Sequence, residues 1–156
     1  MAGHESITAF FARYAEAFER LDVPGVVDHF WLPCSFVGNA GVVTQHDRDG
    51  LEALIAGLMG KYRSIEFGKV TSTSLRAEIL SARLHEVRIH WEIGRRDGSP
   101  LYDFDTIYVL ANYGKGHRIT TVLVVNEAER YQALLEEIAG DQTYVGVRPG
   151  SRGSAL

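Results

Sequence analysis

The stretch from Ile7 to Phe30 constrains the fold of this chain more than any other. Its first half places large apolar side chains three and four residues apart, which puts them on one face of an amphipathic helix: Ile7, Phe10, Phe11, Tyr14, Phe18 and Leu21. Asp22 then caps a second, short helix, whose first turn tolerates Pro24 because the first N–H groups of a helix have no intrahelical partner. A long aromatic helix, a sharp break and a short helix therefore precede the strands.

Beyond Phe30 the hydrophobic period changes twice. Two short strands are expected at residues 34–37 and 42–45, and a third helix begins near Asp47 or Asp49 and carries a core stripe. From Ile65 onward the period is two, which predicts four longer strands, over residues 65–81, 83–95, 101–111 and 117–126. A bend in the first of them is expected at Gly68.

A last helix is expected at residues 127–139, with Asn126 and Glu129 as its capping pair and Gly140 at its end. Helices followed by a run of antiparallel strands predict an α+β fold. We expect one domain over residues 1–140, because the chain shows neither an internal repeat nor a linker. Residues 141–156 are poor in core-forming side chains and are expected to form a flexible tail.

Composition narrows the class of protein. Hydrophobic residues make up 46% of the chain and charged residues 23%, as in an ordinary globular domain. The net charge of -4 and the scattered basic residues argue against a nucleic-acid partner, which needs a clustered basic face. The single cysteine, Cys34, has no partner for an internal disulfide, and neither a secretory signal nor a membrane-spanning run is found. We therefore expect a cytoplasmic protein without a membrane partner.

The opening helices and the order of elements over residues 6–126 resemble the NTF2-like (SnoaL-like) superfamily. This resemblance implies a strongly curved antiparallel sheet, wrapped around the N-terminal helices, with a conical cavity between them as in cystatin-like and NTF2-like folds. It also implies a homodimer, formed through the outer face of the sheet. We expect His90 to pair there with Glu86, Glu92 or a partner subunit. Two sets of side chains are expected to form the interface: the alternating charges Glu86, Arg88, His90 and Glu92, and the nearby Tyr102, Phe104 and Tyr108 of the next strand.

Two carboxyl groups on the strand 101–111 are the main candidates for chemistry. Asp103 and Asp105 alternate onto the face of Ile107, where a buried carboxyl would have a raised pKa and could donate a hydrogen bond to an oxyanion. The alternative is that this face is partly solvated, or paired with Arg88 or Arg118.

Within the superfamily, the ketosteroid isomerases use a tyrosine of an Arg-Tyr pair and a protonated aspartate as oxyanion donors. Tyr14, preceded by Arg13, and Asp105 occupy the similar places in this chain. The aspartate that serves as the isomerase base has no counterpart, because Gly38 stands at its position. Asp103 or His46 are therefore the candidate proton carriers, with His29 as a further histidine near the cavity.

The apolar face of strand 83–95, which includes Trp91, is expected to face the cavity. The full set of expected pocket residues is Phe18, Trp31, Phe36, Leu58, Trp91, Ile107, Thr121 and Leu123. Metal-binding, phosphate-binding and dinucleotide-binding motifs are missing, so neither a metal nor a cofactor is expected.

Two functions fit this pattern. One is a cofactor-independent isomerase, cyclase or dehydratase that acts on an apolar carbonyl compound, with Tyr14 and Asp105 as oxyanion donors. The other is a non-catalytic dimeric module of the same fold that binds an apolar small molecule or another protein.

Overall fold

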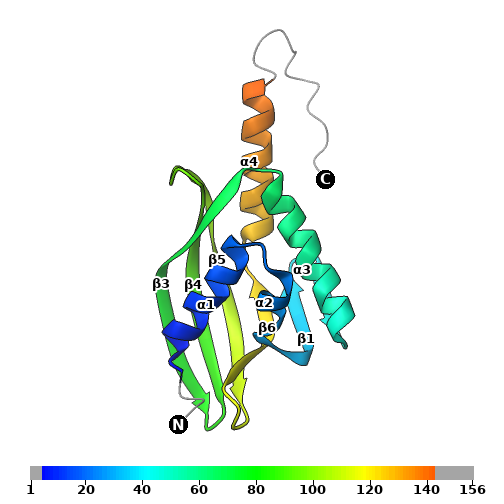
Figure 1. Cartoon of the computed structure of the whole chain (residues 1–156), viewed down its shortest axis with the longest axis vertical. Coiled ribbons are helices and arrows are strands. Elements are labelled where there is room, and N and C mark those ends of the chain that lie inside the picture. The colour runs from blue at the N-terminus through cyan, green and yellow to red at the C-terminus, as the bar shows by residue number, and fades with distance from the viewer. Residues whose placement is uncertain (1–4, 143–156) are drawn as a thin grey trace.

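The computed structural model describes residues 5–142, whose helices and strands make up an α+β fold (Figure 1). The helices are α1 (Ile7–Glu19), α2 (Val23–Val27), α3 (Arg48–Arg63) and α4 (Glu127–Gln142). The strands are β1 (Phe30–Gly38), β2 (Gly41–Gln45), β3 (Phe67–Ser81), β4 (Leu84–Arg95), β5 (Pro100–Asn112) and β6 (His117–Val124). None of the helices in this range is both long and apolar enough to cross a bilayer.

Side-chain caps set the starts of the first three helices. The Ser6 hydroxyl accepts the N–H of Ala9 at 3.0 Å, and the Asp22 and Asp47 carboxylates accept the N–H groups three residues further on in α2 and α3. Each bond satisfies one of the N–H groups that a helix leaves unpaired in its first turn. The expected caps at Asp22 and Asp47 are therefore confirmed.

The six strands form one sheet in the order β2-β1-β6-β5-β4-β3. All neighbouring strands are antiparallel except β1 and β6, which run parallel. Parallel neighbours cannot be joined by a hairpin, and here β2, α3 and the three long strands separate them along the chain. The expected α+β fold with a curved sheet is confirmed, with this one parallel pair as a refinement.

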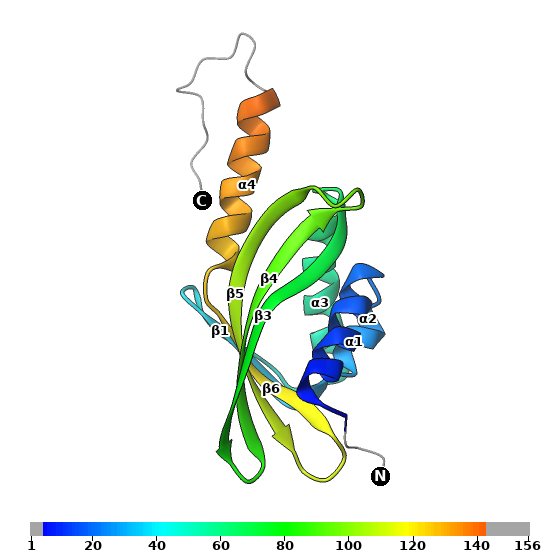
Figure 2. The ribbon, with the colours of Figure 1, turned by 90° about the vertical axis from the view of Figure 1, so that its left-hand side faces the viewer.

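The sheet curves around a layer of helices. Figure 2 shows α1, α2 and α3 on one side of the bent strands β3, β4 and β5, while α4 runs away from the sheet at the end opposite the N-terminus. The buried faces of the first three helices and the concave face of the sheet form one core, in which Phe10, Leu51 and Ile89 are at most 1% exposed. The curvature leaves room between the two layers near the start of α4.

Two boundaries differ from the expected ones by three residues or more. Strand β1 begins at Phe30, four residues before the expected start, because Phe30 already pairs with Ile119 of β6. Helix α4 continues past Gly140 to Gln142. The Asn126 side chain accepts the N–H of Asp105 at 2.8 Å, so it ties α4 to β5. Most of the expected tail, residues 143–156, lies outside the described residues.

Candidate functional site

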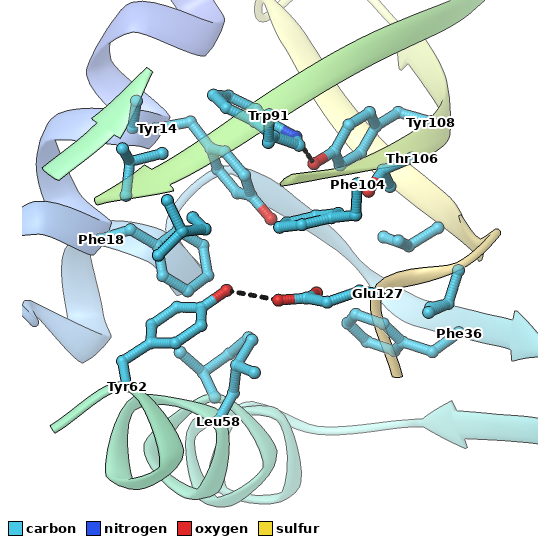
Figure 3. A pocket seen from close by; sticks show the side chains of 16 residues that line it. Tyr14, Phe18, Phe36, Leu58, Tyr62, Trp91, Phe104, Thr106, Tyr108 and Glu127 are labelled. Carbon is cyan, nitrogen blue, oxygen red and sulfur yellow. Dashed lines mark hydrogen bonds between the residues drawn. The ribbon is translucent and has the colours of Figure 1, made fainter. Parts of the chain in front are cut away.

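A cavity of about 90 Å³ lies between the helical layer and the concave face of the sheet (Figure 3). This volume accommodates several water molecules or a small organic group. The helices contribute Tyr14, Phe18, Leu58 and Tyr62 to its wall. The sheet contributes mainly Trp91, Phe104, Thr106 and Tyr108. The wall is therefore apolar and aromatic with a few hydroxyl groups, which is the usual character of a small-molecule site.

Strand register decides which side chains reach this cavity. Trp91 of β4 stands opposite Phe104 of β5, and Tyr108 of β5 stands opposite Val122 of β6. Directly opposed residues share one face of a sheet, so these side chains all point to the concave side. The expectation that Trp91 belongs to the cavity face of its strand is met by this register.

The one carboxyl group among the residues lining the cavity is that of Glu127, the first residue of α4. Its Oε2 accepts hydrogen bonds from the hydroxyls of Tyr102 at 2.7 Å and Tyr62 at 2.9 Å. Figure 3 shows the side chain pointing into the cavity toward Tyr62. Burial raises the pKa of Glu127, while the two tyrosine hydroxyls and the charge of Lys61 oppose the rise.

Tyrosine hydroxyls supply further polar groups of the cavity, beside the hydroxyl of Thr106. Burial raises the pKa of Tyr14 and of Tyr108 well above the ordinary tyrosine value, so both hydroxyls keep their protons at physiological pH. The indole Nε1 of Trp91 donates to the Tyr108 hydroxyl at 2.9 Å and fixes that ring. The Tyr14 hydroxyl points into the cavity (Figure 3), where it can donate a hydrogen bond to a ligand.

Five of the expected pocket and site residues line the cavity. They are Tyr14, Phe18, Phe36, Leu58 and Trp91. Arg13, the neighbour of Tyr14, points outward instead and pairs with Glu5 at 2.6 Å.

The expected partnership of Tyr14 and Asp105 is not formed. Asp105 accepts from His90 Nδ1 at 2.9 Å on the outer face of the sheet, and Asp103 accepts from His90 Nε2 at 2.8 Å. His90 stands opposite Asp105 in the strand register, so it pairs across strands and not with Glu86 or Glu92 along its own strand. Cross-strand partners lie closer than residues two apart on one strand, which explains the difference.

Asp103 and Asp105 lie outside because the opposite face of the same strand is buried instead. That face carries Tyr102, Phe104 and Tyr108. Burying aromatic rings is favourable, whereas burying two carboxylates is costly. The same alternation turns Ile107 of β5 away from the cavity.

Four more expected site residues also lie elsewhere. Thr121 and Leu123 point outward from β6, because their neighbours Val122 and Val124 face the cavity. Trp31 donates its indole N–H to the carbonyl of Ala111 at 3.3 Å, away from the cavity lining. His46 is exposed after β2 and does not line the cavity either.

One known protein family matches most of this chain. A family model described as "NTF2-like protein (DUF6841)" matches residues 4–127, which is most of the chain. The chain belongs to this NTF2-like family. None of the curated proteins compared with it matches.

Solved structures with the NTF2-like arrangement are similar at low sequence identity. Aln2 from a Streptomyces species has a TM-score of 0.63 and 15% identity, over 84% of this chain and 92% of that one. A ketosteroid isomerase-like protein from Erwinia carotovora atroseptica has a TM-score of 0.57 and 16% identity, over 76% and 92%. A Nostoc punctiforme protein of unknown function with a cystatin-like fold has a TM-score of 0.62 and 10% identity, over 76% and 86%. At these identities the similarity shows the fold alone.

Within this NTF2-like fold, Glu127 is the functional candidate that sequence reasoning missed. It falls at the junction of β6 and α4, where an acidic residue is expected on the solvated first turn of a helix. Its tyrosine partners are distant in sequence, so no local motif marks them. Among residues 5–142 no group of three or more potential ligands is arranged to hold a metal ion.

Proposed function

We propose that this protein binds a small apolar molecule with a carbonyl group in its cavity and catalyses proton transfer next to that carbonyl. The observation that carries the proposal is a single carboxyl, that of Glu127, which lies partly buried in an otherwise apolar and aromatic cavity. A buried carboxylate with a raised pKa is a stronger base than a surface glutamate. An isomerase, a cyclase and a dehydratase all need such a group.

The chemistry needs two groups in defined roles. The Glu127 carboxylate removes a proton from the carbon beside the carbonyl. The electron pair of that C–H bond forms a C=C bond, and the π pair of the C=O bond moves onto oxygen to give an enolate. The Tyr14 hydroxyl donates a hydrogen bond to the enolate oxygen and stabilises it. Reprotonation of the enolate by Glu127 then completes the transfer. In this proposal Glu127 has the role of base, because Gly38 stands at the position of the isomerase base in the sequence.

Hydrogen–deuterium exchange tests this proposal without knowledge of the natural substrate. We expect the protein to accelerate exchange of the α-hydrogens of cyclohexanone in D₂O, measured by NMR. The variant Glu127→Gln should lose about 100-fold of the acceleration, the scale of general base catalysis. The variant Tyr14→Phe should also lose about 100-fold, because one oxyanion donor is removed.

The variant Asp105→Asn is the matched control, since it removes a carboxylate from the outer face of the same sheet. It should exchange at the wild-type rate. Exchange no faster with protein than without it, or equal losses in Asp105→Asn and Glu127→Gln, would contradict the proposed base.

A second candidate function is a non-catalytic dimeric module. It is favoured by an apolar row on the outer face of the sheet, in which Val42, Val37, Leu123 and Ile107 stand opposite one another across β2, β1, β6 and β5. Val42 is 65% exposed, so this end of the apolar row is open to solvent. A contiguous exposed apolar patch is typical of an interaction surface. In this reading a homodimer forms through the outer sheet face, and the cavity holds an apolar ligand without reaction.

A further inference from the structure

A wider recess adjoins the cavity beside α4. This recess has a volume of about 460 Å³ and shares Phe36, Leu58, Val124 and Glu127 with the cavity wall. The cavity and the recess are thus neighbouring compartments, and Glu127 lines both. Their combined size falls in the range of sites for small organic ligands.

Lys61 of α3 supplies the positive charge of the recess. Its ammonium group lies 5.7 Å from the centre of the Tyr131 ring, and both side chains line the recess. None of the ion pairs found among the described residues includes Lys61. Lys61 therefore makes no direct ion pair there, although its charge also acts on the Glu127 carboxyl, which lines the same recess. The Tyr131 ring limits where the ammonium group can lie.

The neighbouring groove on the other side of α4 has the opposite charge. It is lined by Glu129 and Glu136 together with residues of the β1–β2 turn. The Glu129 carboxylate already accepts a hydrogen bond from Asn39 at 3.1 Å. An anionic group at the mouth of the site would consequently be repelled on this side and attracted toward Lys61.

We propose that the ligand of this site is an amphipathic organic anion, whose apolar part fills the cavity and whose carboxylate lies beside Lys61. The inference rests on the proposed binding function of the cavity and adds the charge and orientation of the ligand. Lys61 acts here as a specificity-determining residue, not as a catalytic one. A neutral ligand of the same shape loses the contact with Lys61, and a cationic one is repelled by it.

Binding of three matched probes tests the charge of the ligand. The probes are 3-phenylpropanoate, 3-phenylpropanamide and 3-phenylpropylamine, which share one apolar skeleton. The background variant Trp31→Phe leaves Trp91 in the cavity wall as the single tryptophan, so its fluorescence reports binding. We expect the acid to bind about fivefold more tightly than the amide at low salt, the upper range for an exposed ion pair. The preference should fall at high salt, because exposed charges are screened.

The variant Lys61→Met should abolish the preference of the acid over the amide. Arg63→Met is the matched control, since Arg63 is exposed on the same helix, carries the same charge and does not line the recess. It should retain the preference. An equal effect of both variants, an acid that binds no better than the amide, or an amine that binds most tightly would each overturn the inference.

These outcomes also separate this inference from the proposed function. Binding of the amide with the affinity of the acid would leave the cavity as a ligand site and remove only the role of Lys61. Failure of all three probes to change Trp91 fluorescence would overturn both. Loss of α-hydrogen exchange, by contrast, concerns Glu127 and does not bear on Lys61.

Discussion

Single residues show how this chain accommodates carboxyl groups in two different ways. Glu127 lies inside the cavity, where two tyrosine hydroxyls donate to one of its oxygens. Asp103 and Asp105 lie on the outer face and flank one histidine, His90. The first arrangement keeps a carboxyl group among aromatic side chains, whereas the second sets two carboxylates against His90 and Arg130. The difference follows from which face of β5 is aromatic.

The outer cluster predicts a pH-dependent contribution to stability. Both ring nitrogens of His90 bond to carboxylate oxygens, an arrangement that requires both nitrogens to carry protons. The hydrogen bond with Asp105, followed by that with Asp103, raises the pKa of His90, although partial burial opposes the rise. A raised pKa in the folded state means that the stabilisation is complete below the ordinary histidine pKa of about 6.5 and is lost as pH rises through the folded-state pKa.

Urea unfolding of wild type and of His90→Gln measures this contribution. The wild type should be more stable than the variant by up to about 1 kcal/mol at mildly acidic pH, as expected for a half-exposed ion pair. The difference should shrink above neutral pH. His46→Gln is the control, because it makes the same substitution at an exposed histidine outside this cluster. A difference that grows with pH would contradict the charged form of His90.

At the scale of helices and strands, periodicity predicted the type of every element but not how strands turn their faces. The aromatic stripe of α1 and the alternating apolar side chains of β4 are strong signals. The side chains of the stripe and the apolar face of β4 are buried, as expected. Strand β5 carries large apolar side chains on both faces, so alternation alone could not choose between the Asp105 face and the Tyr108 face. Register with β4 decides it, because Trp91 stands opposite Phe104. No local sequence pattern specifies that pairing. The position of Glu127 likewise depends on contacts with residues distant in sequence, Tyr62 and Tyr102.

Strand β3 contains a glycine whose role can be tested. The register of β3 with β4 shifts between Phe67 and Lys69, and a Cβ atom added to Gly68 would lie 2.5 Å from the Arg96 backbone. Only glycine allows that close approach. We expect Gly68→Ala to destabilise the protein by about 1–3 kcal/mol, as overpacking does. The urea midpoint measures the loss.

Gly60→Ala provides the comparison for Gly68. Gly60 lies in α3, and a Cβ atom there would meet nothing within 4 Å. Alanine is preferred over glycine inside helices, so this variant should gain about 0.5–1 kcal/mol. Destabilisation by both substitutions, or by neither, would mean that the approach of Gly68 to Arg96 does not determine the response.

At the scale of the whole molecule, the two faces of the sheet have different surroundings. The concave face and the first three helices enclose the cavity (Figure 3), and the neighbouring recess is lined in part by residues of α4. The convex face is covered by no helix of the N-terminal layer and carries the apolar row described above. Leu123 lies within that row, between Val37 of β1 and Ile107 of β5. A second copy of the chain, packed face to face, would remove this row from water.

Leu123→Arg tests the dimer, because it places a charge inside the apolar row. If the proposed dimer forms through this face, wild type should sediment as a dimer and the variant as a monomer, since an unpaired charge in an apolar interface is strongly unfavourable. Ala56→Arg, on the exposed side of α3, adds the same charge elsewhere and should remain dimeric. Probe binding at Trp91 should survive in the monomer, because the cavity lies on the opposite side of the sheet from Leu123. A wild-type monomer would exclude the interface, and a monomer that no longer binds would show that the two faces are coupled.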